Sequence, residues 1–356
     1  MADNKQNTNP NVPNLRFPEF TEDWSYVSLE SLAPNISAGK DSSEDGKYNL
    51  YGSTGIIGKT KTPTYKGEIV LVARVGANAG LLQYVNDEFG VTDNTLVVNA
   101  HENNKYIYYY LQFYNLNRLV FGSGQPLITG GMLKKIPIGI SIGSSEKNKV
   151  VELLSLIDER IGTQNKIIQQ LQSLIKGIYD KVFEDISNYQ KLSSICTIQK
   201  GQQVNGEELS ELGDYYVMNG GIEPSGYYDR YNTDANTISI SEGGNSCGYV
   251  KYNNVPFWSG GHCYTLQSIT KDYNNLFLFH YLKAKEKEIM ALRIGSGLPN
   301  IQKKDLGKFI VPILPLEMQI GIVDGINKIE TKLKQEKDIL SAYQKQKAYL
   351  LKNLFI

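Results

Sequence analysis

Residues 51–60, YGSTGIIGKT, combine glycines with a Lys-Thr pair, the residue types that hold a nucleotide phosphate. A phosphate-binding loop needs Gly, four residues and then Gly-Lys-Ser/Thr, because backbone N–H groups curl around the phosphate before a helix begins. Counting back from Gly58 puts Ser53 at the first position, and Pro63 biases the preceding residue toward extended structure. The spacing therefore argues against a nucleotide site, and the glycines need another explanation.

The histidines and cysteines offer little chemistry. Three histidines, at positions 101, 262 and 280, are too few and too scattered for a metal cluster. A Cys-His nucleophile could be built from Cys247 or Cys263 with His262, but nothing in the first half of the chain matches it. With Cys196, the cysteines form no CxxC pair, which favours a reducing compartment and a cytoplasmic location. We expect neither a metal nor a catalytic residue.

Length and composition predict a globular protein of at least two domains. The chain has 356 residues, 41% of them hydrophobic, and a formal net charge of zero. A zero net charge still allows a local basic patch that binds nucleic acid. No apolar run approaches the ~20 residues that span a bilayer, so no membrane partner is expected. The polar start, MADNKQNTNPNVPN, is interpreted as a disordered leader.

The two halves of the sequence share a strand-and-loop pattern. GEIVLVARVGANAG at residues 67–80 alternates apolar residues and ends in a glycine loop, as does ANTISISEGGNSCG at residues 235–248. The same offset lays NGGIEPSG, at residues 219–226, on YGSTGIIG, and this second copy has no Lys-Thr pair. Both stretches are therefore interpreted as tight turns between strands.

Each half then continues into a second loop and a long helix. FGSGQPLIT at residues 121–129 corresponds to IGSGLPNIQ at residues 294–302. Apolar residues then recur alternately four and three positions apart, which is typical of a coiled-coil seam. Gln164 and Glu336 interrupt the two patterns at equivalent positions, where polar residues fix register. The predicted seam residues are Leu154, Ile157, Ile161, Ile168, Leu171 and Ile175, then Ile326, Ile329, Leu333, Leu340, Tyr343 and Leu350.

The alternative is that each helix is an ordinary amphipathic helix packed on its own domain. About 36 residues at 1.5 Å each make a rod of roughly 55 Å, longer than a domain of about 130 residues is wide. Two such rods can bury their seams against each other. An antiparallel pair would relate the globular halves by an approximate two-fold, whereas a parallel pair would put both halves at one end.

Further motifs complete the order of elements. These are LRFPEFTEDWSYVSLESLA at residues 15–33, the strand VTDNTLVV at residues 91–98, both GSG-x-P loops and both terminal helices. In their order and duplication they resemble the DNA-specificity (S) subunit of Type I restriction-modification systems along essentially the whole chain. The chain lacks the Asn/Asp-Pro-Pro-aromatic motif that adenine methyltransferases share, so we expect no methylase activity from it alone.

The resemblance implies an α+β fold with two similar strand-rich target-recognition domains, related by a pseudo-two-fold and separated by two long helices in an antiparallel coiled coil. The expected boundaries are a leader at residues 1–14, recognition domains at 15–146 and 187–316, and spacer helices at 147–186 and 317–356. Each recognition domain would read one half of a split double-stranded DNA target. Two methyltransferase subunits would dock on the chain and recruit motor-nuclease subunits, with S-adenosylmethionine and ATP bound on those partners rather than on this chain.

Base-reading residues cannot be transferred by motif, because recognition domains vary within the family. Arg and Lys suit guanine edges and phosphates, and Asn and Gln can pair with adenine. Candidates on or beside predicted loops are Lys59, Lys61, Arg74, Asn78, Gln125, Lys134 and Lys135 in the first domain, and Lys200, Gln202, Gln203, Arg230, Asn245, Arg293, Gln302, Lys303 and Lys304 in the second. Each could equally be an ordinary solvated side chain; Lys303 and Lys304 adjoin a repeated glycine loop, which favours a phosphate contact.

Two tyrosine clusters, at residues 106–110 and 227–231, could stack on a displaced base or belong to the core. NKYIYYYLQFYNL predicts a helix with Tyr106, Tyr109, Tyr110 and Phe113 on one face. For the whole chain, the competing functions are an adaptor or antirestriction-like protein that uses the helices without reading DNA, and an isolated hydrolase. Salt-sensitive duplex binding would separate the first from a DNA reader.

Overall fold

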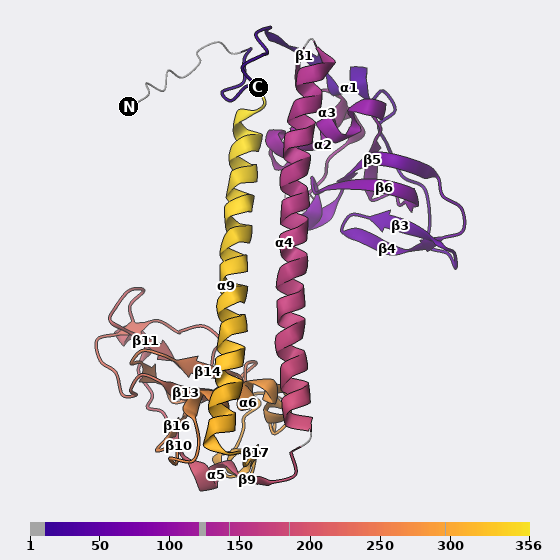
Figure 1. Cartoon of the computed structure of the whole chain (residues 1–356). Helices are drawn as coiled ribbons and strands as arrows, with labels where there is room; N and C mark the ends of the chain where they lie inside the picture. The colour runs from indigo at the N-terminus through magenta and orange to yellow at the C-terminus, as the bar shows by residue number, and fades with distance from the viewer. Residues whose placement is uncertain (1–10, 121–125, 142, 185, 296) are drawn as a thin grey trace, which may run out of the picture. The chain divides into compact units, whose positions relative to one another are not determined.

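The computed structural model describes residues 11–120, 126–141, 143–184, 186–295 and 297–356, without the side chain of residue 184. The chain divides into two compact units. Unit 1 comprises Met1–Asn165 and Asp338–Ile356, and unit 2 comprises Lys166–Lys337. Each unit therefore contains a strand-rich body together with part of each long helix (Figure 1).

Unit 1 is built on a six-stranded sheet of order β2-β7-β5-β6-β3-β4. Its elements are β1 (Trp24–Ser28), α1 (Leu29–Leu32), β2 (Ser37–Ala38), β3 (Tyr48–Gly52), β4 (Gly55–Thr60), β5 (Tyr65–Ala73), η1 (Gly76–Asn78), β6 (Leu82–Val91), β7 (Thr95–Val98), η2 (His101–Asn103), α2 (Asn104–Tyr114), η3 (Leu116–Leu119), α3 (Gly130–Lys134) and β8 (Pro137–Ser141). The β-branched and apolar run at residues 69–73 makes β5 the buried central strand. As predicted, YGSTGIIG forms the β3–β4 hairpin, with Gly52 opposite Gly55.

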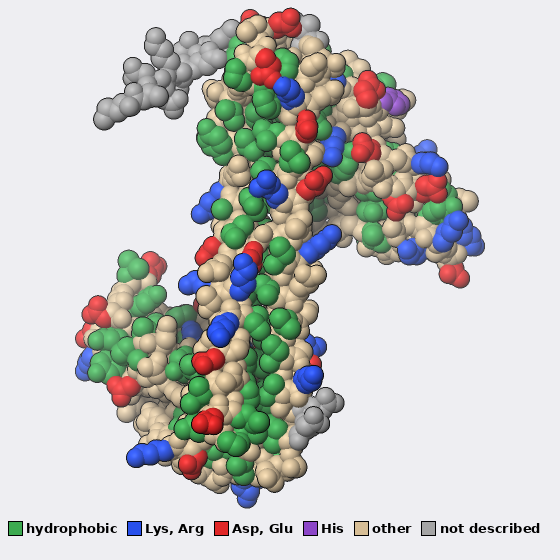
Figure 2. Space-filling view, viewed as in Figure 1, with side chains coloured by type: hydrophobic (Ala, Val, Ile, Leu, Met, Phe, Trp, Pro, Cys, Tyr) green, Lys and Arg blue, Asp and Glu red, His purple; other side chains and the backbone are tan. Residues whose placement is uncertain are grey.

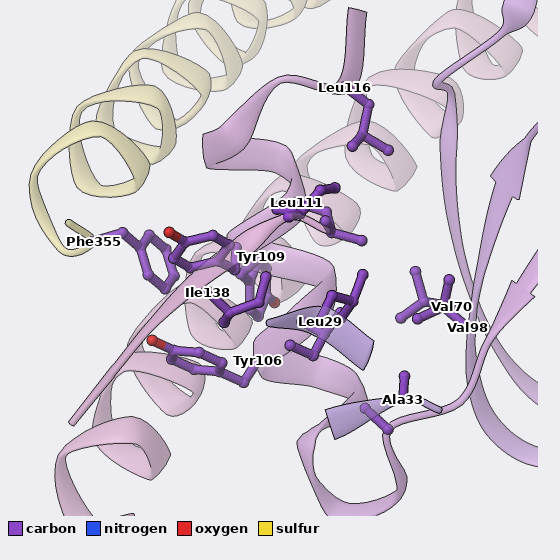
Figure 3. Close-up of a cluster of buried hydrophobic side chains, with 14 of the residues drawn as sticks. Leu29, Ala33, Val70, Val98, Tyr106, Tyr109, Leu111, Leu116, Ile138 and Phe355 are labelled. Atoms are coloured by element: carbon purple, nitrogen blue, oxygen red, sulfur yellow. The ribbon is translucent and has the colours of Figure 1, made fainter. Parts of the chain in front are cut away.

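The core of unit 1 lies between the sheet and α2. Tyr106, Tyr109 and Tyr110 are buried there, so the first tyrosine cluster belongs to the core and is not available to a base. Phe355, just beyond the end of α9 (Leu316–Asn353), lies edge-on to Tyr106 and Tyr110 at centroid distances of 5.6 and 5.5 Å. Figure 3 shows Phe355 among the side chains of this core.

Unit 2 repeats this plan with smaller sheets, of order β10-β16-β13-β14 and β12-β11-β15. Its elements are β9 (Tyr189–Lys191), α5 (Leu192–Ile195), β10 (Thr197–Lys200), η4 (Gly206–Glu208), β11 (Tyr215–Met218), β12 (Tyr227–Tyr228), β13 (Thr237–Ser241), β14 (Val250–Asn253), β15 (Trp258–Ser259), β16 (Cys263–Gln267), α6 (Asn275–Ala284), α7 (Glu286–Met290), α8 (Lys303–Gly307) and β17 (Ile310–Pro312). Phe183, near the end of α4 (Ser144–Glu184), packs edge-on against Phe277 and Tyr281 of α6, as Phe355 packs on α2 in unit 1.

One turn prediction is wrong in unit 2. NGGIEPSG forms no tight hairpin, because β11 ends at Met218 and β12 begins only at Tyr227. The segment between them folds back on β11, where the Val217 N–H donates to the Gly226 carbonyl and the Ser225 N–H donates to the Val217 carbonyl. Gly220 takes φ of +87°, and its Cα lies close to His262, so the glycine serves a close approach rather than a two-residue turn.

The long helices bury the predicted stripe. All twelve predicted seam residues are buried or half-buried, whereas Leu156, Leu174 and Tyr349 on other faces are exposed. In unit 1 the two helix segments run antiparallel, since Lys347 pairs with Asp158 at 2.7 Å while Tyr343 receives the guanidinium of Arg160 on its ring. In unit 2, Phe183 and Val323 from the two helices share one core.

The start of the described chain is also folded into unit 1. The Asn11 carbonyl accepts from the Trp24 N–H at 2.9 Å, and the Leu15 N–H donates to the carbonyl of Asn353 at 2.8 Å. Residues 1–10 of the expected leader lie outside the described residues.

Both helix starts precede the expected positions: α4 begins at Ser144 and α9 at Leu316. Within the described ranges, no helix has the length and apolar character to cross a membrane.

Candidate nucleic-acid interface

A loop framework is duplicated in the two units down to individual backbone hydrogen bonds. In unit 1 the Gly76 N–H donates to Pro126 and the Gly80 N–H donates to Ala73, at 3.0 and 2.8 Å. In unit 2, Gly244 donates to Pro299 and Gly248 to Ser241, at the same two distances. The φ angles also agree, at 76° and 92° in unit 1 and 77° and 93° in unit 2. These are the glycines that the repeat aligned, so the framework positions equivalent loops in both units.

Several predicted residues of unit 2 surround this framework. Lys200 pairs with Glu242 at 2.6 Å, the Gln202 N–H donates to Ser259, and Gln302 donates to Asn300 beside the loop. Gln203 lies against Gly261, and Asn245 is exposed on the glycine loop itself. The structure therefore brings together Lys200, Gln202, Gln203, Asn245 and Gln302, which come from three separate stretches of sequence.

Arg230 belongs to an aromatic group beside that framework. Its guanidinium lies over the Tyr228 ring, 5.4 Å from the centroid, and Tyr228 packs edge-on against Trp258 at 5.0 Å. The Trp258 indole N–H donates to the Gln202 carbonyl at 2.8 Å, which links this group to the framework. Arg230 also pairs with Asp229, and both side chains are exposed, so this pair stabilises little.

Lys303 and Lys304 lie at the start of α8 and are exposed. They line an open hollow together with Lys191 and Lys308. Lys308 is paired with Asp305 at 2.9 Å, which leaves the other three without an ion pair among the described residues. This hollow is a concentration of positive charge of the kind that holds phosphate. Arg293 is exposed beyond α7; burial raises the pKa of Cys247, and the charge of Arg293 only partly offsets that rise.

The predicted residues of unit 1 fall into separate groups. Arg74 and Asn78 share the glycine loop, and the Arg74 N–H donates to the Asn94 carbonyl at 2.9 Å. Lys59 donates to Asn49 across the β3–β4 pair, and Lys61 follows it, exposed. Figure 2 shows basic and acidic side chains interspersed over this end of the sheet.

The remaining candidates of unit 1 lie near α3. Lys134 pairs with Glu30 at 3.1 Å and is half-buried, whereas Lys135 is exposed. Gln125 lies outside the described residues. Lys134 is thus partly committed to a structural contact, and Lys135 is the freer of the two lysines.

The cysteines and histidines do not support the catalytic alternatives, which need a reactive thiol or a metal site. Burial raises the pKa of Cys196 to about 12 and of Cys263 to about 11, and it also raises the pKa of Cys247, so all three are thiols near neutral pH. His280 is buried and accepts or donates at Tyr179, 2.9 Å away, as a core histidine does. In the described part of the chain, no group of three or more His, Cys, Asp or Glu side chains could hold a metal.

The family model for the Type I restriction modification DNA specificity domain matches the chain twice, at residues 21–173 and 186–342. The chain belongs to this family. The two matches confirm the internal repeat and the resemblance drawn from the motifs. Because the relatives are specificity subunits, the family also assigns the chain a recognition role and not an enzymatic one, so the hydrolase hypothesis is wrong.

Relatives cover almost the whole chain. A putative type I specificity subunit of Mycoplasma genitalium is 25% identical over 335 residues, with 87% of each chain covered. A type I restriction enzyme specificity subunit of Methanocaldococcus jannaschii is 25% identical over 400 residues, covering 93% of this chain and 92% of its own. Both similarities extend through the two specificity domains.

Solved structures share the fold. The crystal structure of a Type-I restriction-modification system S subunit from M. genitalium superimposes with a TM-score of 0.72 at 22% identity, covering 97% of this chain and 99% of that one. A chain solved in work on complex assembly and conformational transition of the type I R-M system gives a TM-score of 0.58 at 15% identity, covering 95% and 98%. The α+β fold with two similar domains is thereby confirmed.

Sequence reasoning missed the residues at the centre of the unit 2 framework. Glu242 joins Lys200, Tyr264 and the loop at residues 299–302, and His262 lies 4.0 Å from it. The signal was present in the repeat, since the offset that aligns the glycines also places Glu242 on Arg74 and His262 on Asn94. Glu242 is neither cationic nor an amide, so residue type alone does not predict it as a DNA contact.

Proposed function

We propose that the chain reads a bipartite DNA target, with one recognition domain on each half-site. The observation that carries the proposal is the duplicated loop framework, which keeps its backbone hydrogen bonds while its side chains differ between the units. Equal backbones can meet the DNA backbone in the same way, and unequal side chains can read different bases. Such a reader recognises an asymmetric sequence from a repeated scaffold.

Phosphate contacts are assigned to the basic hollow and base contacts to the loops. Lys191, Lys303 and Lys304 carry the charge of the hollow in unit 2. Arg and amide side chains on the glycine loops supply the donor and acceptor patterns that distinguish base pairs in the major groove. The proposed contacts remain those predicted from sequence. Among them Lys134, Lys200 and Arg230 are the weaker candidates, because Glu30, Glu242 and Asp229 already pair with them.

Partner subunits would dock on exposed apolar surface near the helices. In unit 2, Leu316, Met318 and Ile320 at the start of α9 are 42, 56 and 42% exposed. Figure 2 shows hydrophobic side chains gathered over this part of the helix surface. Two methyltransferase subunits, and through them the motor-nuclease subunits, are the proposed partners. S-adenosylmethionine and ATP would bind on those partners, and the assembly would act in the cytoplasm.

The two long helices are proposed to act as the spacer between the half-sites. Their buried stripes continue along both helices, with Gln164 and Glu336 as buried polar positions at equivalent places. A continuous antiparallel coiled coil would use these positions to fix its register.

Co-expression with the cognate methyltransferase subunits, followed by mapping of modified adenines, tests the proposal. We expect a split motif with an unspecified gap, and salt-sensitive binding of the purified complex to a duplex that carries it. A contiguous motif would contradict the assignment of one domain to each half-site. A complex that assembles but neither modifies nor binds duplex DNA would instead support an adaptor that does not read DNA.

A further inference from the structure

One loop position carries opposite charge in the two units. The Arg74 N–H donates to the carbonyl of Asn94, and the Arg74 carbonyl accepts from Ile128, both at 2.9 Å. Glu242 makes the matching pair of backbone bonds, donating to His262 at 2.9 Å and accepting from Ile301 at 2.8 Å. The backbone environment is therefore the same, and the side chain is what differs.

Arg74 has unused hydrogen-bonding capacity. Its guanidinium offers five N–H donors and no acceptor. The side chain is half-buried and makes neither a hydrogen bond nor an ion pair within the described residues. Asn94, which holds its backbone N–H, is exposed beside it. Donors placed in this way at a loop surface can bind an acceptor from outside the chain.

Glu242 has an unused hydrogen-bond acceptor, whereas Arg74 has unused donors. Its Oε1 accepts from Lys200 Nζ at 2.6 Å and from the Tyr264 hydroxyl at 3.0 Å. Its Oε2 is buried and has no hydrogen-bond partner among the described residues, and the nearest candidate, His262 Nδ1, is 4.0 Å away. A buried acceptor left without a donor is uncommon in folded proteins. The His262 ring beside it is 64% exposed, so it can move away without disturbing the core.

We propose that this position reads a base edge in each half-site: Arg74 pairs with the O6 and N7 acceptors of guanine, and Glu242 accepts the N4 amino group of cytosine on Oε2. These are the pairings that the two side chains favour in the major groove. The inference rests on the proposed function and specifies how its two domains differ. In unit 2, His262 swings aside to admit the base, while Lys200 and Tyr264 hold the carboxylate as positioning residues.

A phosphate contact does not account for both residues. Phosphate would attract Arg74 but repel Glu242, although the same backbone hydrogen bonds hold both. Base edges present donors as well as acceptors, so a single loop position can carry either charge. Opposite side chains on one framework therefore favour base reading over backbone binding.

The test uses the full chain assembled with its methyltransferase subunits and a randomised DNA library, with the modified sequences read out. Arg74→Gln should weaken the preference for guanine at one position of one half-site by roughly 5- to 150-fold. Glu242→Gln should weaken the preference for cytosine at one position of the other half-site to a similar extent. In each case the other half-site and the remaining bases should keep their preferences.

Matched charge changes away from the framework are the controls. Lys345→Gln and Glu211→Gln, at exposed positions of units 1 and 2, should leave the motif unchanged, and all variants should co-purify with the methyltransferase subunits. His262→Ala should retain the cytosine preference, because the ring only covers Oε2. Loss of that preference in His262→Ala, with retention in Glu242→Gln, would assign the reading to His262 and overturn the inference.

Failure of the inference differs from failure of the proposed function. If the wild-type complex shows a split motif but both glutamine variants keep it unchanged, the proposed function stands and this position is not the reader. If the wild-type complex modifies no split motif, the function itself is refuted. Lys200→Met adds a further readout: it should weaken the same cytosine preference as Glu242→Gln, and an effect spread evenly over all bases would indicate that Lys200 binds phosphate instead.

Discussion

Each long helix has a buried polar residue near its start, and the two residues are satisfied by different chemistry. Glu146 accepts from Arg16 at 2.7 and 2.9 Å and from the Trp24 indole at 3.0 Å. In the second helix the buried polar residue is Gln319, which accepts from the Asn274 N–H and donates to two backbone carbonyls. Unit 1 thus uses a buried ion pair where unit 2 uses a neutral amide, and the ion pair is the more sensitive to losing one partner.

Arg16→Ala should therefore destabilise unit 1 by about 3 to 5 kcal/mol, because it leaves the carboxylate of Glu146 buried without its cation. Chemical denaturation monitored by the fluorescence of Trp24, in a Trp258→Phe background so that only unit 1 reports, would measure the change. Glu30→Ala, which breaks the exposed pair with Lys134, is the matched control and should cost ~1 kcal/mol or less. Equal effects of the two changes would show that the Arg16 pair is no better buried than a surface pair.

His280 should make unit 2 sensitive to acid. Burial lowers the pKa of His280 from 6.5 to about 4. Between pH 6.5 and pH 4, His280 is therefore protonated in the unfolded chain but remains neutral in the folded chain. Stability is then full above pH 6.5 and falls as the pH drops toward 4, by about 3 kcal/mol in total. Glu330, whose pKa burial raises, acts in the opposite direction.

His280→Gln should flatten this dependence when unfolding free energies are measured from pH 7 to pH 4. His101→Asn is the control, because His101 is exposed and Asn tolerates its φ of +52°. An unchanged pH profile in His280→Gln would indicate that another group governs acid unfolding.

At the level of elements, sequence periodicity predicted most of the burial pattern of the long helices. The four-three spacing identified buried positions such as Ile168, and the glycine repeat identified both loop frameworks. It could not predict that Arg16 reaches Glu146 or that Lys200 pairs with Glu242, because these contacts join residues 130 and 42 positions apart and depend on the tertiary fold. The second-copy turn was also mispredicted, since its glycines serve a close approach to His262.

The seam can be tested with two substitutions on one helix. Ile168→Ala, at a position that is 8% exposed, should lower the free energy of unfolding by about 2 to 4 kcal/mol through a cavity and lost burial. Leu174→Ala, at 50% exposure, should change it by about 0.5 kcal/mol or less. Thermal unfolding of the two variants side by side would measure this; the reverse order of effects would mean that the stripe is out of phase.

At the level of the whole molecule, the spacer proposal makes a quantitative prediction. Inserting one heptad into α4 after Asn165 and one into α9 after Lys337, where the units meet in sequence, preserves the phase of both stripes. Seven residues add about 10 Å, which corresponds to about 3 base pairs at 3.4 Å each. Methylation mapping should show the same two half-sites with a gap longer by that amount. An unchanged gap would exclude the helices as the ruler.

The docking of Phe355 against Tyr106 and Tyr110 has a consequence for biosynthesis. Although most of unit 1 is translated first, its core includes residues 338–356, which leave the ribosome only after every residue of unit 2. Unit 1 therefore keeps an exposed apolar face until residues 338–356 have been synthesised, whereas unit 2 can complete its fold before then. Nascent chains that are stalled or truncated shortly before Leu350 should therefore leave unit 1 accessible to chaperones and proteases, whereas unit 2 should be protected from both.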